Sequence, residues 1–307
     1  GRGLCRWAPT VDIERDPRWG RNEEAYGEDP FLTGELSASL TAGMTGEHPV
    51  YLRVLPTLKH FCANNCEEQR VNGNSYLPPR LKYEYYYAAF MPAICFGGAK
   101  SVMTAYNEIN GVPALCNPDL NRILKEKWGL WFAVTDGADF SQTLLAHRYG
   151  KSHSDIYAES VRAGCDIMTD DEGLVRSAAE KALHSGLLTE TELDRMLTRT
   201  LYARMRLGQL SSDCPYDSIT PDQIDANSAR EINLCAAEEQ IVLLKNDGML
   251  PLRKPKRLVV CGPLADENLM DWYTGYFRDE VSVLNGVRTE FPDAEICTDS
   301  LWDIVSV

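Results

Sequence analysis

The sequence predicts an α/β fold in which short buried strands alternate with helices. Residues 132–134 (Phe-Ala-Val) are the clearest strand, because turn residues flank this apolar run on both sides. Similar short apolar runs recur between segments with helical spacing, and such alternation favours parallel pairing with right-handed crossovers. The run at 132–134 also leads into Asp136 and Gly137, and a carboxylate in that place is typical of the reacting end of a parallel sheet.

Five strands are predicted before residue 170. They are the apolar segments at residues 4–13, 54–61, 101–106, 132–134 and 165–169. Pro9 interrupts the first of them. A closed (β/α)8 TIM-type barrel needs eight strands, so we expect a barrel that is incomplete at its N-terminus, with its first strands preceding Gly1.

Helices are expected between these strands, at residues 31–44, 81–95, 118–127, 156–163 and 172–210. The first has its large apolar residues on one side, namely Phe31, Leu32, Leu36 and Leu40. Residues 172–210 are expected to form two helices that are divided near Gly186. Thr189 and Glu192 have the spacing of a capping box at the start of the second helix.

The barrel domain is assigned to residues 1–210 and a linker to residues 211–232, a segment that begins with a polar, proline-containing stretch. Residues 233–307 are interpreted as the truncated beginning of a C-terminal α/β sandwich domain. A helix is expected at 229–239, and short strands are expected at 241–244 and 257–261. The sequence begins with Gly1 rather than Met, and we expect a fragment that lacks both ends.

The composition narrows the classes of partner. The chain has 307 residues, a formal net charge of −14 and 44% hydrophobic residues, which suffices for one large domain and part of another. The acidic balance argues against nucleic acid and anionic membranes, which select basic patches, and suits a neutral, soluble ligand. No apolar run is long enough to span a bilayer. A homo-oligomer stays open.

Ten cysteines are scattered singly, and only Cys62 and Cys66 lie close together. No CxxC pair exists, so we expect no zinc site and interpret the cysteines as free buried thiols of a reducing compartment. A cytoplasmic location is therefore expected, although secretion stays open because the N-terminus is missing. The acidic run at residues 170–172 is interpreted as a solvated loop, and no metal or other cofactor is expected.

Polar side chains are predicted to converge where the strands end. Asp136 would face a ring of hydrogen-bond donors, namely Arg21, Lys59, His60, Arg70 and Tyr106. Donors of this kind bind sugar hydroxyls. An ionised carboxylate such as Asp136 can attack an anomeric carbon and form a glycosyl ester.

Each of these residues has a structural alternative. Asp136 could cap the next helix, because Asp is a favoured N-cap residue. Lys59 and His60 could form a satisfied pair at a strand end. The others could be ion-paired or packed: Arg21 and Arg70 with Glu23, Glu67 or Glu68, and Met103 and Tyr106 in the core.

Several motifs, read in order, resemble glycoside hydrolase family 3. They are WAP at 7–9, Asp12, DPRWGRNE at 16–23, GEDP at 27–30, LKHF at 58–61, Asn64-Asn65 with Arg70, MTAYN at 103–107, GVP at 111–113, WGL at 128–130, VTD at 134–136, IVLLKN at 241–246 and LPL at 250–252. Each motif alone is weak, but their common order makes the resemblance specific.

The resemblance implies a retaining, exo-acting β-glycosidase that releases terminal β-D-glucosyl residues by double displacement, without a cofactor. It implies that Asp136 is the nucleophile. It assigns the terminal sugar's hydroxyls to Arg21, Lys59, His60 and Arg70, and the pocket lining to Met103 and Tyr106. The acid/base of most members is a Glu of the second domain, and no equivalent is found before Val307. Residues 62–66 (CANNC) lack the Gly-His-Gly loop of the family's N-acetylglucosaminidases.

Three rivals stay open at this point. Gly137 follows the proposed nucleophile where many family glucosidases have Trp and many xylosidases have Cys, so a β-xylosidase or α-arabinofuranosidase is an alternative. A catalytically incomplete sugar-binding protein is the second. An unrelated barrel enzyme that forms a Schiff base on Lys59 is the third.

Overall fold

The computed structural model describes residues 3–270, 273–275 and 280–299. The chain divides into two compact units, Gly1–Thr220 and Pro221–Val307. The division falls inside residues 211–232, the segment that the sequence predicts as a linker.

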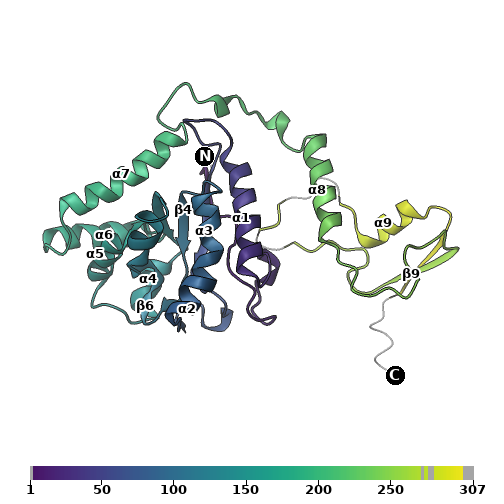
Figure 1. The fold of residues 1–307 in the computed structure, drawn as a ribbon, viewed down its shortest axis with the longest axis horizontal. Coiled ribbons are helices and arrows are strands. Elements are labelled where there is room, and N and C mark those ends of the chain that lie inside the picture. Colours follow the sequence, from purple (N-terminus) through teal and green to yellow (C-terminus); the bar gives the residue numbers. More distant parts are fainter. Residues whose placement is uncertain (1–2, 271–272, 276–279, 300–307) are drawn as a thin grey trace. The chain divides into compact units, whose positions relative to one another are not determined.

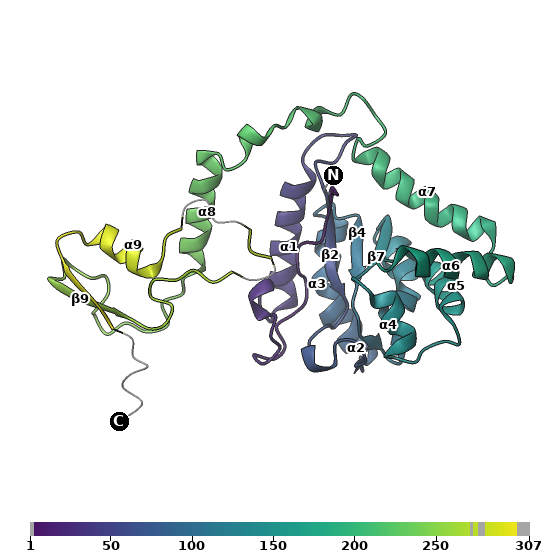
Figure 2. The same cartoon turned by 180° about the vertical axis from the view of Figure 1, so that it is seen from behind.

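The first unit is built on a five-stranded sheet with the strand order β1-β2-β4-β7-β8. The strands are β1 (Cys5–Arg6), β2 (Leu55–Phe61), β4 (Ser101–Thr104), β7 (Phe132–Thr135) and β8 (Cys165–Ile167). Every neighbouring pair in this order is parallel. Figure 2 shows β2, β4 and β7 side by side. The predicted parallel α/β fold is confirmed, whereas a closed eight-stranded barrel stays a prediction.

Helices connect the strands and cover the sheet (Figure 1). They are α1 (Pro30–Thr45), α2 (Pro79–Leu81), α3 (Tyr87–Cys95), α4 (Asp139–Leu145), α5 (His153–Ala163), α6 (Glu172–His184) and α7 (Glu190–Arg206). Two segments are π-helical, Lys82–Tyr86 and Leu120–Lys125. The predicted capping box is confirmed: the Glu192 amide donates to Thr189 Oγ1 (3.3 Å), and the Thr189 amide donates to Glu192 Oε2 (2.9 Å).

The loops after β2 and β4 form a small second sheet. It has the order β3-β5-β6 and consists of β3 (Asn74–Ser75), β5 (Glu108–Ile109) and β6 (Val112–Pro113). Asn110, in the turn between β5 and β6, has a positive φ of 53°. Its side chain accepts a hydrogen bond from the Leu77 amide (2.7 Å), so this turn anchors the loop that follows β3.

The two faces of the main sheet carry different apolar clusters, because successive residues of a strand point to opposite faces. One face joins the large core, to which Leu58, Val102 and Ala133 contribute together with α3. The other face carries a smaller cluster of Leu52, Leu55, Met103, Phe132, Val134, Ala203 and Leu207. Both faces are therefore covered, as a parallel sheet requires.

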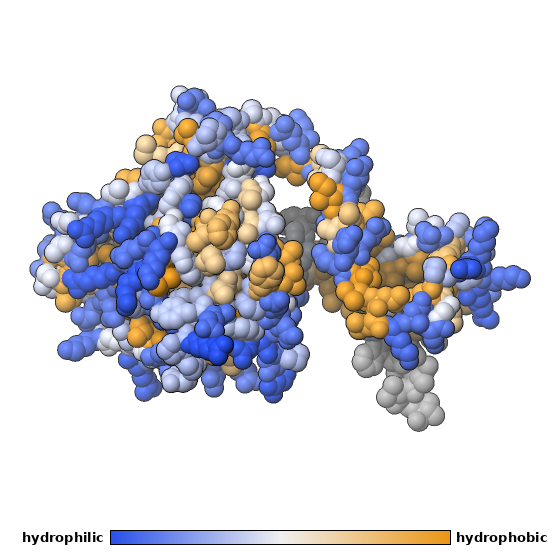
Figure 3. Space-filling view, in the orientation of Figure 1, coloured by the Kyte–Doolittle hydropathy of each residue, from blue (hydrophilic) through white to orange (hydrophobic). Residues whose placement is uncertain are grey.

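Helix α1 turns its apolar side outward, contrary to the usual expectation for an amphipathic helix. Phe31, Leu32, Leu36 and Leu40 are exposed, whereas the buried residues are Thr33, Gly34, Ser37, Thr41 and Thr45. The buried side of α1 carries small residues, which lets α1 approach α3 closely. The approach is so close that a Cβ at Gly34 would lie 2.7 Å from Pro92 Cγ. Figure 3 shows apolar residues gathered over α1 and α3 on the face in view.

Three local predictions need correction. The strand expected at 4–13 is only β1 with an isolated bridge between Thr10 and Lys59, because Pro9 breaks the ladder. Residues 241–244, expected to be a strand, have no regular structure. The cysteines are all free, but Cys66, Cys95, Cys235 and Cys261 are exposed rather than buried. None of these local errors changes the order of the main strands.

The second unit contains a parallel strand pair. Its elements are α8 (Asn227–Gln240), β9 (Arg257–Cys261), α9 (Val283–Glu290) and β10 (Glu295–Asp299). Strands β9 and β10 pair in parallel with α9 between them in sequence, which is a βαβ arrangement. Within the described part of the chain, no helix has the length and apolarity to cross a membrane.

Candidate active site

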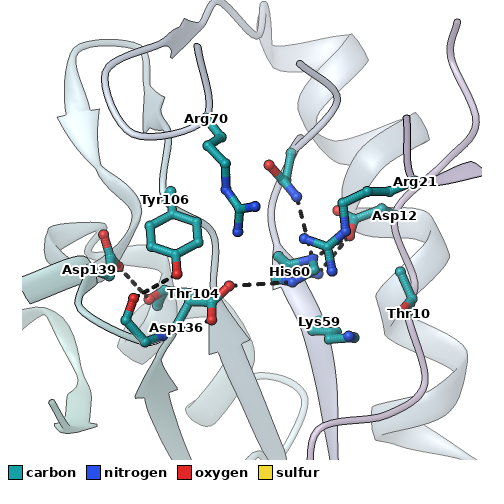
Figure 4. A network of polar contacts seen from close by, with 12 residues as sticks. Thr10, Asp12, Arg21, Lys59, His60, Arg70, Thr104, Tyr106, Asp136 and Asp139 are labelled. Atoms are coloured by element: carbon teal, nitrogen blue, oxygen red, sulfur yellow. Dashed lines mark hydrogen bonds and ion pairs between the residues drawn. The ribbon is translucent and has the colours of Figure 1, made fainter. Parts of the chain in front are cut away.

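The predicted site residues come together at the carboxyl ends of β2, β4 and β7 (Figure 4). His60 lies near the end of β2, Tyr106 follows β4, and Asp136 follows β7. The parallel register of these neighbouring strands brings their carboxyl ends to one edge of the sheet. Residues separated by 76 positions therefore meet, since His60 Nε2 lies 3.4 Å from Asp136 Oδ2.

Asp136 keeps part of its carboxylate open to solvent, with 14% of the side chain exposed. Its Oδ1 accepts the amide hydrogen of Gly137 (2.7 Å). Helix α4 instead begins after Ala138, and no side-chain hydrogen bond caps it. The alternative in which Asp136 serves as a helix cap is therefore wrong.

Burial and the Asp12 carboxylate hold the ring edge of His60 that points away from Asp136. The His60 side chain is 2% exposed, and its Nδ1 lies 2.7 Å from Oδ2 of Asp12. The same oxygen accepts the backbone amide of His60 (3.0 Å). Asp12 belongs to a motif of the resemblance, but the sequence reasoning assigned it no role. A carboxylate inside the apolar run Val11-Asp12-Ile13 was the available signal, because a buried acid needs a partner.

Glu24 holds two of the predicted sugar-binding cations. Its Oε1 accepts from Arg21 Nε (2.7 Å), and its Oε2 lies 3.0 Å from Lys59 Nζ. Thr10 donates to the same Oε2 (3.2 Å). Arg21 therefore pairs with Glu24 rather than with Glu23. This ion pair fits the alternative in which Lys59 and His60 are satisfied at a strand end, and it also orients the ammonium group, whereas a sugar-binding role for Lys59 stays a prediction.

Glu24 is expected to support stability only above acidic pH. Burial opposes its ionisation, but hydrogen bonds and positive charge from Arg21 and Lys59 outweigh burial and lower the pKa of Glu24 to about 2. A lowered pKa stabilises the fold above the ordinary Glu value, and that contribution is lost as the pH falls towards 2. Glu24→Gln should therefore cost about 1–2 kcal/mol at pH 7, after allowance for solvent screening.

Urea unfolding between pH 7 and pH 2.5 measures this effect. The difference between the wild type and Glu24→Gln should shrink below about pH 4.5, because the wild-type carboxylate is then protonated as the chain unfolds. Glu23→Gln is the matched control, since the exposed Glu23 lies beside it in sequence. A difference in unfolding free energy between the wild type and Glu24→Gln that stays constant from pH 7 to pH 2.5 would contradict the lowered pKa of Glu24.

Tyr106 lies on the side of Asp136 away from Asp12, and the Arg70 side chain lies above Asp136 in the view of Figure 4. The guanidinium carbon of Arg70 is 4.7 Å from the centre of the Tyr106 ring, and Arg70 Nη1 lies 3.2 Å from Glu67 Oε2. Burial, followed by the charge of Asp136, raises the pKa of Tyr106 to about 12, although Arg70 opposes this. The protonated hydroxyl donates to the Gly137 carbonyl oxygen (2.6 Å), next to the proposed nucleophile.

Met103 differs from the other predicted site residues. Its side chain is 1% exposed and belongs to the smaller apolar cluster with Leu55, Phe132 and Val134. Its position in β4, one residue before Thr104, places it within the sheet. The packing alternative weighed for Met103 fits this position, and a lining role in a sugar pocket stays a prediction.

Asp139 is a second acid near Asp136 that the sequence reasoning did not identify. It is 0% exposed, Thr104 Oγ1 lies 3.2 Å from its Oδ2, and its Oδ1 has no hydrogen-bond partner among the described residues. Burial, followed by the charge of Asp136, raises the pKa of Asp139 well above its ordinary value. A buried carboxyl group of this kind is favoured in its neutral form.

The raised pKa predicts a loss of stability with rising pH. When the pH rises above the ordinary Asp pKa, Asp139 of the unfolded chain releases a proton that folded Asp139 retains. The free energy of unfolding therefore falls as the pH rises. Asp139→Asn cannot ionise. Between the ordinary Asp pKa and the raised pKa of folded Asp139, the unfolding free energy of Asp139→Asn relative to the wild type should therefore rise with pH, by up to about 1.4 kcal/mol per pH unit. Urea unfolding from pH 4 to pH 7 measures this slope, and parallel curves for the two proteins would contradict it.

The described residues contain no group of three or more His, Cys, Asp or Glu side chains placed to hold a metal ion. The described groups at the site supply a partly open carboxylate, a histidine and several cations. Such an arrangement can bind hydroxyl groups and present a nucleophilic oxygen.

Comparisons with known proteins show which family the chain resembles. The sequence model described as "Glycosyl hydrolase family 3 N terminal domain" matches residues 4–203, and that of the "Glycosyl hydrolase family 3 C-terminal domain" matches residues 241–301. The chain is 31% identical to the probable beta-D-xylosidase 7 of Arabidopsis thaliana, over 95% of this chain and 40% of that protein. It is 30% identical to the periplasmic beta-glucosidase of Salmonella typhimurium, over 94% of this chain and 39% of that protein.

Solved structures show the same likeness. A GH3 exo-beta-xylosidase (XlnD), in complex with a xylobiose aziridine activity-based probe, has a TM-score of 0.88 at 29% identity, over 96% of this chain and 40% of that one. A beta-glucosidase from Listeria innocua, in complex with glucose, has a TM-score of 0.86 at 28% identity, over 96% of this chain and 42% of that one. The chain thus spans about 40% of the length of these relatives. Because the N-terminal domain model alone covers most of it, the chain belongs to glycosyl (glycoside) hydrolase family 3.

Proposed function

We propose that the enzyme containing this chain is a retaining, exo-acting β-glycosidase that removes terminal β-D-glucosyl residues from oligosaccharides or glycosides. One observation carries the proposal: a partly open Asp136 carboxylate at the carboxyl edge of the parallel sheet, 3.4 Å from His60 Nε2. Arg21, Lys59 and Arg70 surround the same edge (Figure 4). Cations and N–H donors around one open carboxylate suit a ligand rich in hydroxyl groups.

In this mechanism Asp136 attacks the anomeric carbon, and the bond between that carbon and the leaving oxygen breaks. A second carboxylic acid gives its proton to the leaving group. The resulting glycosyl ester of Asp136 is then hydrolysed by water, whose proton returns to the second group. Retention of configuration requires the two carboxyl groups to lie roughly 5–5.5 Å apart. By the resemblance, the second group is expected to be a Glu of the second domain, for which no equivalent is found before Val307.

Trapping of the ester tests the proposal. We expect a 2-fluoro glycoside to add one sugar to the peptide that contains Asp136 in the complete enzyme, as seen by mass spectrometry after digestion. A sugar-binding protein without catalysis would bind the reagent reversibly and show no added mass, which would overturn the proposal. Borohydride reduction that links substrate to Lys59 would instead support the Schiff-base alternative.

β-Xylosidase or α-arabinofuranosidase activity is the second candidate. Relatives named beta-D-xylosidase and one named beta-xylosidase/alpha-L-arabinofuranosidase, from Medicago sativa, match the chain at about 31% identity. A Cβ at Gly137 would meet no atom within 4 Å, so the residue after Asp136 does not narrow the site. The rates of hydrolysis of aryl β-glucoside, β-xyloside and α-arabinofuranoside by the complete enzyme would separate the candidates.

A further inference from the structure

The loop after β1 runs alongside β2 and delivers Asp12 to His60. The Lys59 amide donates to the Pro9 carbonyl oxygen (3.1 Å), and the Val11 amide donates to the Lys59 carbonyl oxygen (2.6 Å). These two bonds flank the parallel bridge between Thr10 and Lys59. Asp12 is therefore held opposite His60 by backbone pairing, and its position does not depend on a flexible side-chain contact.

A single oxygen of Asp12 holds both the backbone and the ring of His60. Oδ2 accepts the His60 amide (3.0 Å) and lies 2.7 Å from His60 Nδ1. The side chains of Asp12 and His60 are 0% and 2% exposed. Rotation of the ring would break a buried, charge-assisted hydrogen bond, so this carboxylate fixes which ring edge faces the site.

The opposite ring edge faces the proposed nucleophile. His60 Nε2 lies 3.4 Å from Asp136 Oδ2, while Asp136 Oδ1 accepts the Gly137 amide (2.7 Å). A bare ring nitrogen would turn a lone pair towards a carboxylate, and that contact is repulsive. The contact with Asp136 is favourable only when Nε2 carries hydrogen, and the bond to Asp12 needs hydrogen on Nδ1, so the arrangement requires a doubly protonated ring between two carboxylates. Both oxygens of Asp136 then face N–H groups.

We propose that Asp12 is a positioning residue for the nucleophile: it orients His60 so that the Nε2–H group holds Oδ2 of Asp136. This inference rests on the proposed function only in naming Asp136 a nucleophile. Asp12 acts through His60 and touches neither sugar nor reacting atoms. Without Asp12, the ring would lose the partner that fixes its orientation, and Asp136 would lose one of the two contacts that aim its carboxylate.

Histidine ¹⁵N NMR of this chain tests the positioning without any activity. The chain has five histidines, and loss of one signal set in His60→Gln assigns His60. We expect the wild-type Nε2 to show the chemical shift of a nitrogen that bears hydrogen, and the His60 signals to move in Asp12→Asn. Asp119→Asn is the matched control, because Asp119 is 3% exposed and is bound by Lys82 and Tyr87 rather than by His60. A bare Nε2 in the wild type, or unchanged His60 signals in Asp12→Asn, would overturn the proposal.

Ester formation in the complete enzyme is the second readout. Asp12→Asn should slow trapping by a 2-fluoro glycoside about ten- to a hundredfold, the effect of losing one hydrogen bond to a charged group. Asp119→Asn should trap at the wild-type rate even if its melting temperature falls. If the wild type forms no ester, the proposed function fails together with the nucleophile role. If the wild type forms the ester and Asp12→Asn matches its rate, the positioning role alone fails.

Discussion

Asp136→Asn should lower kcat of the complete enzyme on an aryl β-glycoside by about three orders of magnitude or more, the scale seen when a covalent nucleophile is removed. The amide of Asn is a very poor nucleophile, so the glycosyl ester should not form. Asn has nearly the same shape, and 14% of the Asp136 side chain is exposed, so we expect little change in unfolding free energy. Steady-state hydrolysis and urea unfolding measure the two quantities.

Asp155→Asn is a suitable control for this experiment. Asp155 is likewise partly buried and lies in the first turn of α5, where its Oδ2 accepts the Ser152 hydroxyl (2.7 Å). Its variant should keep wild-type kcat. Turnover by Asp136→Asn within tenfold of the wild type would refute the nucleophile assignment, provided that the preparation is free of wild-type enzyme.

Asp166→Ala should destabilise the first unit by about 3–5 kcal/mol, the cost of removing one partner from a buried ion pair. Asp166 lies in β8 and is 3% exposed. Its Oδ2 contacts Lys125 Nζ and accepts the Ala133 amide (2.9 Å), and its Oδ1 lies 3.1 Å from Arg199 Nη1. Burial lowers the pKa of Lys125, and Asp166 opposes that shift.

The cost arises because truncation leaves the buried Lys125 ammonium without its counter-charge, although the Gly164 carbonyl oxygen still accepts from it (2.6 Å), and leaves the Ala133 amide without its acceptor. Urea unfolding of the chain measures it, with the transition of the first unit followed by tryptophan fluorescence. Asp166→Asn should cost less, because its amide oxygen can still accept the Ala133 hydrogen bond. A loss below about 1 kcal/mol for Asp166→Ala would show that water replaces the carboxylate and that the site is not dry.

The parallel pairing of the strands and the edge that carries the site could be predicted from the sequence. Apolar runs such as residues 132–134, separated by helical segments, predict parallel strands, and parallel strands place His60 and Asp136 at one edge. The capping box of Thr189 was also predictable, because it depends on residues only three positions apart. These features follow from patterns among residues that are close together in the sequence.

The partners of the site residues could not be predicted in the same way. Arg21 had Glu23 and Glu24 beside it, and only the folded loop shows that Glu24 pairs with both Arg21 and Lys59. The outward apolar side of α1 depends on the close approach of Gly34 to Pro92. Spacing along a helix shows which residues share a side, but it does not show which side meets a neighbour.

The sequence by itself determined the parallel α/β class, the family motifs and the carboxylate that follows β7, because each is written in short-range patterns or single residues. The tertiary structure decided the partners of the other groups: Asp12 contacts His60, Asp139 accepts a hydrogen bond from Thr104, and Met103 packs in the apolar cluster. The physical reason is that hydrogen bonds and burial act over a few ångströms in space. Residues 48 positions apart, such as Asp12 and His60, become neighbours only after the strands have paired.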